Sequence, residues 1–222
     1  MVITRFAPSP TGFLHIGNVR AALMNYLLAK KSSGNFILRI DDTAQERSKQ
    51  EYVAAIKIDL EWLGLEWDRI EYQSARLDLY KSASDKLRSI DLLYECFETP
   101  SELDLKRKKQ LNMGKPPVYD RAAVALSDQE KSNLRSDRGD GHWRFKLEQN
   151  RIEWNDGILK DLSIDAASVS DPVLIRADGQ YLYTLASVVD DIDMEITDVV
   201  RGSDHVTTVS YTHLTLPTIY SV

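Results

Sequence analysis

The residues best suited to chemistry near the N-terminus lie in the run RFAPSPTGFLHIGN, from Arg5 to Asn18. Two prolines and a glycine interrupt an apolar run there and predict a stiff turn. His15 follows at a predicted helix start, where backbone N–H groups and the helix dipole favour phosphate. Gly17 has no side chain, so a nucleotide could lie against its backbone. The alternative is a loop in which His15 only caps the helix.

Acidic residues follow a second apolar run, in the order Asp41-Asp42. The carboxyl end of a parallel strand faces the ligand crevice, so one of them could hold an ammonium group. The alternative role is a helix N-cap. Arg5 lies on the first apolar run and needs a carboxylate partner when buried, from a ligand or from Asp41 or Asp42 in a structural ion pair.

The elements that would position these residues are two strands, near 2–6 and 35–40, with a helix between them that runs to about Lys31. This βαβ unit predicts a parallel sheet. Two more helical patterns carry Val53, Ile56, Leu60 and Leu63, and then Leu77, Tyr80, Leu87, Ile90 and Tyr94.

From residue 97 the pattern changes, because Asp156-Gly157 and Asp178-Gly179 each stand between strand-like runs and predict hairpins. Residues 196–200 are expected to return to the parallel sheet. We therefore predict an α/β fold, a Rossmann-like parallel sheet interrupted by an α/β insertion. The expected domains are 1–96 for the first half of the sheet, 97–184 for the insertion and 185–208 for the second half.

Composition narrows the choice of partners. The net charge of −6 is not that of a globally basic protein, so a nucleic-acid partner needs a local patch. The densest basic run is Lys106-Arg107-Lys108-Lys109, which is otherwise a solvated helix face. With Cys96 as the single cysteine, neither a disulfide nor a four-cysteine zinc site can form. We expect a reducing, cytoplasmic compartment, with no signal peptide and no membrane segment.

The motifs resemble one family. His15-Ile16-Gly17-Asn18 matches the HIGH motif of class I aminoacyl-tRNA synthetases, and the whole run 5–18 resembles the glutamyl-tRNA synthetase signature. The segments 181–191 and 196–205 resemble two later stretches of that family. The family commonly has Glu at position 41 and Asp at position 44, where this chain has Asp41 and Ala44.

The resemblance implies two ligand sites and a catalytic pair. The ATP site would comprise Thr11, His15, Gly17, Asn18, Asp204 and His205, of which His15 and Asn18 would be catalytic. The glutamate site would comprise Arg5, Ala7, Ser9, Asp41, Tyr183, Ser187 and Arg201. Arg201 is the natural partner of the substrate's side-chain carboxylate. Without the resemblance, Tyr183 would be read as core packing and Arg201 as a surface salt bridge.

In that family the insertion binds the tRNA acceptor end. By this resemblance the tRNA contacts would be Lys106, Arg107, Lys108, Lys109 and Arg121. Some members carry a zinc knuckle near the position of Cys96, but the lone cysteine implies no zinc here. ATP would bring Mg²⁺ as its counter-ion, and we expect a monomer.

The implied function is that of a glutamate–tRNA ligase, which makes glutamyl-adenylate from L-glutamate and ATP and transfers the glutamyl group to the tRNA 3′ end. The family's lysine-rich loop and helical anticodon-binding domain do not appear, so we expect a truncated chain that is inactive as given. Residues 209–222 do not resemble the family, and the stretch VSYTHL at 209–214 matches one reading frame of a sequencing adapter, so we expect a non-native tail.

Three alternatives remain from the sequence. One is a short paralogue of the glutamyl-queuosine type that glutamylates a modified base in tRNA. Another is a small HIGH-type nucleotidyltransferase that makes a dinucleotide-like cofactor. The third is a non-catalytic fragment that binds glutamate or tRNA without turnover.

Overall fold

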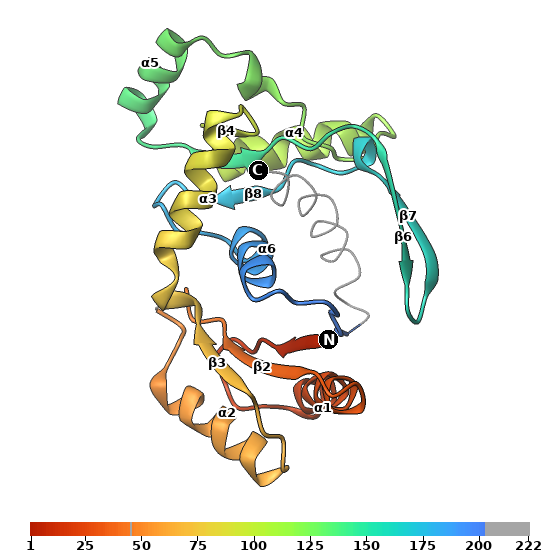
Figure 1. The fold of residues 1–222 in the computed structure, drawn as a ribbon. Coiled ribbons are helices and arrows are strands. Elements are labelled where there is room, and N and C mark those ends of the chain that lie inside the picture. The colour runs from red at the N-terminus through yellow and green to blue at the C-terminus, as the bar shows by residue number, and fades with distance from the viewer. Residues whose placement is uncertain (45, 203–222) are drawn as a thin grey trace. The chain divides into compact units, whose positions relative to one another are not determined.

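A computed structural model describes residues 1–44 and 46–202, which divide into two compact units (Figure 1). The first unit comprises Met1–Lys81 and the described residues from Val189 onward, and the second comprises Ser82–Val188. The domain limits drawn from the sequence stay predictions. The predicted tail at 209–222 and two predicted ATP-site residues, Asp204 and His205, lie outside the described residues.

The first unit is built on a parallel three-stranded sheet with the order β1 (Ile3–Phe6), β2 (Asn35–Ile40) and β3 (Arg69–Tyr72). Helix α1 (Ile16–Lys31) connects β1 to β2, and α2 (Gln50–Trp62) precedes β3. The predicted βαβ unit and parallel sheet are therefore confirmed, while β3 was not predicted. The Rossmann-like α/β class is also confirmed.

The core of this unit forms around β2, whose residues from Phe36 to Ile40 are buried. A strand buried on both faces reads as a continuous apolar run, as β2 does apart from one arginine. Helix α2 packs its predicted face on this core with Val53, Ile56 and Leu60. The connection from α1 is tight, because a Cβ on Gly34 would lie 1.9 Å from the carbonyl oxygen of Val2.

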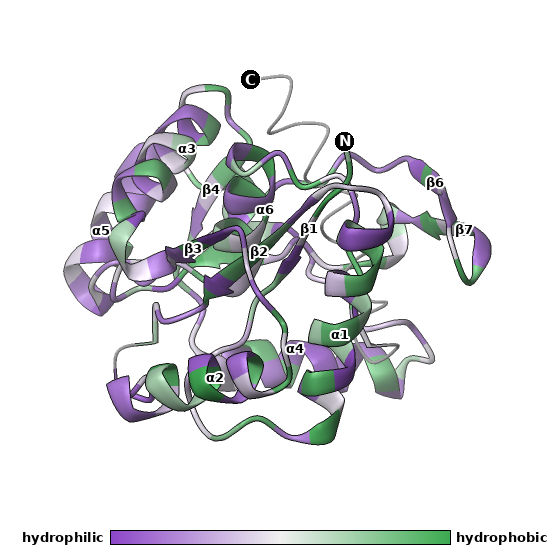
Figure 2. Ribbon diagram, turned by 60° about the horizontal axis from the view of Figure 1, so that its bottom comes forward, coloured by the Kyte–Doolittle hydropathy of each residue, from purple (hydrophilic) through white to green (hydrophobic). Residues whose placement is uncertain are grey.

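The buried face of helix α1 consists of small residues and an asparagine, and several of its large apolar residues are exposed. Ala22, Asn25 and Ala29 are buried, whereas Ile16 is 84% exposed and Leu27 is 50% exposed. The small alanines allow a close approach to the sheet, and the hydroxyl of Thr4 donates to the carbonyl of Asn25 at 2.8 Å. Figure 2 shows apolar residues along α1 that this packing leaves outside the core.

A short 3₁₀ turn, η1 (Gln73–Ala75), leads into α3 (Leu77–Ser89) and then β4 (Leu93–Cys96). The sequence placed Tyr94 on the helix, and this prediction is wrong. The helix ends at Ser89, Asp91 takes a left-handed backbone with φ 57°, and Tyr94 enters a strand. Its hydroxyl donates to the carboxylate of Asp171 at 2.6 Å, a non-local contact that helical spacing could not reveal.

The second unit holds an antiparallel sheet with the order β4, β5 (His142–Phe145) and β8 (Val173–Ile175). Helices α4 (Pro100–Asn112) and α5 (Asp128–Arg138) and the short turns η2 (Ala122–Ala125) and η3 (Ala166–Ser168) complete it. Strands β6 (Arg151–Asp156) and β7 (Lys160–Asp165) form the predicted hairpin at Asp156-Gly157. The predicted turn at Asp178-Gly179 also forms, because Arg176 N–H donates to the carbonyl of Gln180 and Ile175 bridges Tyr181.

Helix α6 (Tyr183–Asp193) follows, and then a segment that was expected to rejoin the sheet. Residues 196–200 form no strand, so this expectation is wrong. Thr197 does reach the edge of β1, where its Oγ1 accepts from Ile3 N–H at 2.8 Å and its own N–H donates to the Ile3 carbonyl at 3.0 Å. Asp198 N–H shares that carbonyl at 3.3 Å, so the contact stays at one residue of β1.

Across the described ranges, no helix combines the length and the hydrophobicity that crossing a membrane requires.

Candidate functional site

The start of α1 carries the first part of the site. His15 is the N-cap, and its Nδ1 accepts from Gly17 N–H at 3.1 Å. The Oδ1 of Asn18 accepts from His15 N–H at 3.2 Å, which completes a reciprocal capping box. Because Nδ1 is an acceptor, a neutral His15 carries its proton on Nε2. The exposed imidazole can therefore cap the helix and still donate to a ligand.

The glycine at position 17 is required by packing, in addition to the predicted approach of a nucleotide. A Cβ there would lie 2.9 Å from Cε1 and 3.0 Å from Nδ1 of His15. The absence of a side chain at Gly17 thus leaves room for the capping imidazole.

The proline-rich turn is hydrogen-bonded to the segment that follows β2. The carbonyl of Pro8 accepts from Asp41 N–H at 3.0 Å, and the carbonyl of Pro10 accepts from Lys49 N–H at 3.1 Å. Both prolines are buried, while Ser9 is exposed between them. The turn after β1 is therefore hydrogen-bonded to the residue that follows β2 and to the N-cap of α2.

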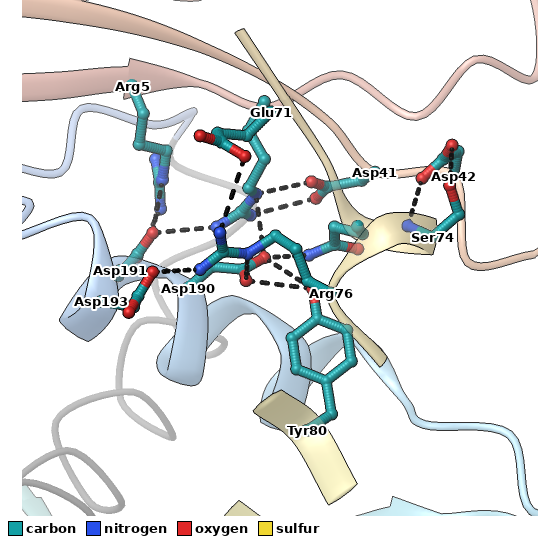
Figure 3. A network of polar contacts seen from close by, with 12 residues as sticks. Arg5, Asp41, Asp42, Glu71, Ser74, Arg76, Tyr80, Asp190, Asp191 and Asp193 are labelled. Carbon is teal, nitrogen blue, oxygen red and sulfur yellow. Dashed lines mark hydrogen bonds and ion pairs between the residues drawn. The ribbon is translucent and has the colours of Figure 1, made fainter. Parts of the chain in front are cut away.

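Arg5 is buried on β1 and forms a bidentate ion pair with Asp191 of α6 (Figure 3). Its Nε donates to Oδ1 and its Nη2 to Oδ2, both at 2.9 Å. The sequence considered Asp41 or Asp42 as the structural partner, and the ion pair is instead made by Asp191. Asp42 is used elsewhere, since its carboxylate accepts from the backbone and hydroxyl of Ser74.

Arg39 is a fully buried arginine on β2 that the sequence reading gave no role. Its Nε and Nη2 donate to the two carboxylate oxygens of Asp41 at 2.7 and 3.1 Å. Its Nη1 donates to Oδ1 of Asp191 at 3.0 Å. A charged residue in the apolar run NFILRI was the available signal, because a buried charge requires a partner.

Asp190 forms a second centre beside the first. Its carboxylate accepts from Arg76 Nε at 2.7 Å, from Gln73 Nε2 at 2.8 Å and from the Tyr80 hydroxyl at 3.0 Å. Arg76 also pairs with Asp193 and, at 3.6 Å, with Glu71. Figure 3 shows the end of α6 supplying the carboxylates that these groups surround.

The two carboxylates nearest Arg39 have different electrostatics. Burial raises the pKa of Asp191, but the guanidinium groups of Arg5 and Arg39, together with the charge of Arg201, bring it below its usual value. Burial also dominates at Asp41 and leaves its pKa raised, although Arg39 and Arg5 oppose the shift. Arg201, a predicted glutamate ligand, thus acts electrostatically on the same carboxylate as Arg5.

The other predicted ligands lie as follows. Ala7 is half-buried and Thr11 is exposed, both on the proline-rich turn. Tyr183 opens α6 and is 40% exposed, and Ser187 is buried one turn later. Residues four apart share a helix face, so Tyr183, Ser187 and Asp191 lie in one row along α6. The assignment of these residues to glutamate and ATP stays a prediction.

In the second unit, several of the predicted tRNA contacts take part in internal ion pairs. Lys106 pairs with Glu98 and Asp120, and Lys108 pairs with Asp104. The predicted set is completed by Arg107 and Lys109, which are exposed on α4, and by Arg121.

Arg121 has a structural role that the sequence did not indicate. It donates to both carboxylate oxygens of Asp171, at 2.8 and 2.7 Å, and to the carbonyl of Leu147. These contacts tie the segment before η2 to the segment before β8, so tRNA binding by this residue stays a prediction.

Three side chains that could hold a metal ion lie together around Cys96, where some members of the family carry a zinc knuckle. The ligand atoms of Cys96, Glu98 and His142 lie within 4.8 Å of one another. The Tyr119 hydroxyl lies 2.8 Å from Glu98 Oε1 and 3.6 Å from Cys96 Sγ. Burial raises the pKa of the Cys96 thiol to about 12, so the sulfur is a thiol at neutral pH. The absence of zinc stays a prediction.

The parallel sheet, the crossover helix and the charged residues at its strand ends place the first unit in the Rossmann-like α/β class. A family model described as tRNA synthetases class I (E and Q), catalytic domain, matches residues 1–217. The chain belongs to this family. The match extends into the segment that was expected to be a non-native tail.

Relatives and solved structures agree with this membership. Glutamate–tRNA ligase 1 of Ruegeria pomeroyi is 75% identical over 93% of this chain and 47% of its own length. A glutamate tRNA ligase from Elizabethkingia meningosepticum, solved in complex with its amino acid, is 33% identical with a TM-score of 0.87 and covers 99% of this chain and 47% of that chain. The glutamate–tRNA synthetase of Elizabethkingia anophelis is also 33% identical, with a TM-score of 0.88, and the match covers 99% of this chain and 48% of that chain. The chain spans about half the length of the curated relatives it matches.

Proposed function

We propose that this chain is the catalytic region of a glutamate–tRNA ligase. The observation that carries the proposal is the presence of two buried, opposite charges on neighbouring strands of the parallel sheet, with Arg5 on β1 and Asp41 directly after β2. Glutamate offers carboxylates to one and an ammonium group to the other. Family membership and the 75% identical glutamate–tRNA ligase support it.

In the first step, an oxygen of the glutamate α-carboxylate attacks the α-phosphorus of ATP. The bond from that phosphorus to the oxygen bridging to the β-phosphate breaks, and pyrophosphate leaves. His15 acts as a hydrogen-bond donor through Nε2, at a helix N-terminus whose dipole favours the phosphate charge. Asn18 fixes His15 through the capping box, so the donor is held before the substrate arrives.

Glutamate would be held by the charged groups of the first unit. The guanidinium of Arg5 uses its Nε and Nη2 for Asp191, so a ligand carboxylate would approach its Nη1 side. Asp41 would receive the α-ammonium group, since each carboxylate oxygen can accept more than the one hydrogen bond from Arg39. Arg201 would take the side-chain carboxylate, with Ser9, Ala7, Tyr183 and Ser187 completing the predicted site.

Mg²⁺ would arrive with the phosphates of ATP. In the part of the chain that the structure describes, the one group of three or more potential metal ligands is the Cys96 group of the second unit. Its thiol and imidazole are not the oxygen ligands that Mg²⁺ prefers. The ion would supply charge stabilisation at the phosphates and would need no carboxylate cage from the described residues.

The second substrate would be tRNA, whose terminal ribose hydroxyl attacks the carbonyl carbon of the adenylate and releases AMP. Basic residues of α4, with Arg107 and Lys109 exposed, would contact its phosphates. We place this activity in the cytoplasm and expect a monomer.

The experiment is isothermal titration calorimetry of the purified 222-residue chain with L-glutamate. Separate titrations with L-glutamine and L-aspartate serve as comparison ligands. We expect binding that is selective for glutamate, because glutamine lacks the second carboxylate and aspartate is one methylene shorter. ATP–pyrophosphate exchange is measured on the same preparation. Exchange would show that the chain is active by itself, whereas glutamate binding without exchange fits both an inactive catalytic region and the binding-fragment alternative. No selectivity among the three amino acids would contradict the proposed substrate.

A further inference from the structure

Asp191 is the carboxylate shared by the arginines of the two neighbouring parallel strands β1 and β2. Arg5 of β1 contacts both of its oxygens, and Arg39 of β2 contacts Oδ1. The side chains of Arg5, Arg39 and Asp191 are each at most 4% exposed. Such an arrangement restricts the orientation of both guanidinium groups, because each donates to the same fixed carboxylate.

Arg39 extends this contact to Asp41. The order of contacts is Arg5 to Asp191, Asp191 to Arg39, and Arg39 to Asp41, with donor–acceptor distances from 2.7 to 3.1 Å. The two ends of this chain of ion pairs, Arg5 and Asp41, are the groups of opposite charge to which the proposed function assigns glutamate. The two middle members, Asp191 and Arg39, join these ends, and Asp191 also feels the charge of Arg201.

We propose that Asp191 and Arg39 are positioning residues for glutamate binding, which set the distance and orientation between Arg5 and Asp41. The inference rests on the proposed function, because it concerns how that glutamate site is built. Substrate would meet two charges already aligned, so neither side chain would have to reorganise on binding. Removal of the central carboxylate would leave Arg5 without its anchor and would allow Arg39 to turn away from Asp41.

Asp190 supplies a matched comparison within the same helix. It is also fully buried and also accepts several hydrogen bonds, but its partners are Arg76, Gln73 and Tyr80. It also lies near this chain of ion pairs, with 3.6 Å between its Oδ2 and the Nε of Arg39. If both carboxylates only stabilise the fold, replacing either aspartate should affect glutamate binding equally. If Asp191 positions the glutamate site, its replacement should weaken glutamate binding more than that of Asp190.

The experiment compares Asp191→Asn with Asp190→Asn in the full 222-residue chain. Titration gives the Kd for L-glutamate and for ATP, and thermal unfolding gives the Tm. We expect both variants to lose thermal stability, since each removes a buried charge from its partners. Asp191→Asn should raise the Kd for glutamate by ~10-fold or more, the cost of a lost charge-assisted hydrogen bond, and leave the Kd for ATP unchanged. Asp190→Asn should leave both constants close to wild type.

A second variant keeps the inference testable if Asp191→Asn does not fold. Asp191→Glu retains the charge but moves the carboxylate by one methylene, so we expect a folded chain with weakened glutamate binding and unchanged ATP binding. Arg39→Lys should behave in the same way, because an ammonium group cannot bind both oxygens of Asp41 and also Asp191 in the same geometry.

Two results would overturn the inference, and they differ from each other. If the wild-type chain binds glutamate and both asparagine variants weaken that binding equally, the aspartates are structural and the proposed function stands. If the wild-type chain does not bind glutamate under conditions in which it is folded, the proposed function fails and the positioning role fails with it.

Discussion

The guanidinium of Arg39 donates to both carboxylate oxygens of Asp41, two residues further along the chain, at 2.7 and 3.1 Å. Alternate residues of a strand share a face, so this pair forms without any bend of the backbone. The contact favours the ionised form of Asp41 and fixes the direction of its carboxylate, although burial raises its pKa overall. A carboxylate held in this way is prepared for an ammonium ligand.

We expect Asp41→Asn to weaken glutamate binding. The amide keeps the shape and its oxygen can still accept one of the two hydrogen bonds from Arg39, but the change removes the charge that an α-ammonium group would meet. We predict a rise in the Kd for L-glutamate of about 10- to 100-fold, the range for one hydrogen bond between charged groups. Titration with ATP is the control, because Asp41 is not in the predicted ATP site. An unchanged glutamate Kd would remove Asp41 from the site.

Gly34 is expected to be intolerant of any side chain. A Cβ there would lie 1.9 Å from the carbonyl oxygen of Val2, at the junction of α1 and β2. We predict that Gly34→Ala lowers the free energy of unfolding by about 3 kcal/mol, as overpacking at a rigid backbone contact does. Gly157→Ala is the control, since a Cβ at Gly157 meets nothing within 4 Å. Urea titration of the two variants measures the difference, and equal midpoints would contradict it.

Cys96 should be unreactive in the folded chain. Burial raises the pKa of its thiol to about 12, and the thiolate is the reactive form. We therefore expect modification by a chromogenic disulfide reagent at pH 8 to be slow, and fast once urea unfolds the chain. Since the chain has a single cysteine, the absorbance reports this residue alone. Fast reaction without denaturant would show that the site opens in the native state.

His142 should make stability depend on pH. Burial, with a contribution from Arg144, lowers its pKa below the ordinary value of 6.5, while Glu98 opposes the shift. A depressed histidine pKa means that the unfolded chain binds the proton more readily. Its stabilising contribution is therefore present above pH 6.5 and is lost as the pH falls from 6.5 toward the folded-state pKa.

The measurement is the unfolding free energy between pH 5 and pH 8 for the wild type and for His142→Gln. The glutamine cannot titrate in this range, so the slope below pH 6.5 should be smaller in the variant. The same slope in both proteins would assign the pH dependence to other groups.

Replacement of Arg107 and Lys109 by alanine should weaken tRNA binding and reduce its salt dependence. Both are exposed on α4, and each phosphate contact contributes about 0.9 to the slope of log K against log salt for a duplex. Lys31→Ala, an exposed lysine outside the predicted patch, is the control. If the slope of the double variant equals that of the wild type, the basic run is only a solvated helix face.

Much of the first unit could be predicted from the sequence, because short-range patterns determine it. The alternation of a stiff turn, an amphipathic helix and an apolar strand predicted β1, α1 and β2 with limits close to those observed. The buried face of α1 could not be predicted in this way, since alanine and asparagine at 22, 25 and 29 face the sheet while larger apolar residues do not. Close packing of a helix on a sheet favours small residues there, and hydrophobicity alone does not indicate this.

The capping role of His15 was foreseen as an alternative, and the ligand role that the resemblance implies is compatible with it. The partner of Arg5 could not be foreseen, because Asp191 lies 186 residues away and the pattern VVDD does not indicate which strand it meets. For the same reason the central place of Arg39 was missed. Contacts between distant parts of the chain depend on topology, which local periodicity does not encode.

The separation between Arg39 and Asp191 also matters while the protein is being made. Arg39 meets that carboxylate only after 152 further residues have been added, which at ~5–20 residues per second takes roughly 8–30 seconds. During this interval the two arginines have no counter-ion from α6. The ion pairs that join α6 to β1 and β2 can therefore form only after residue 191 has been added.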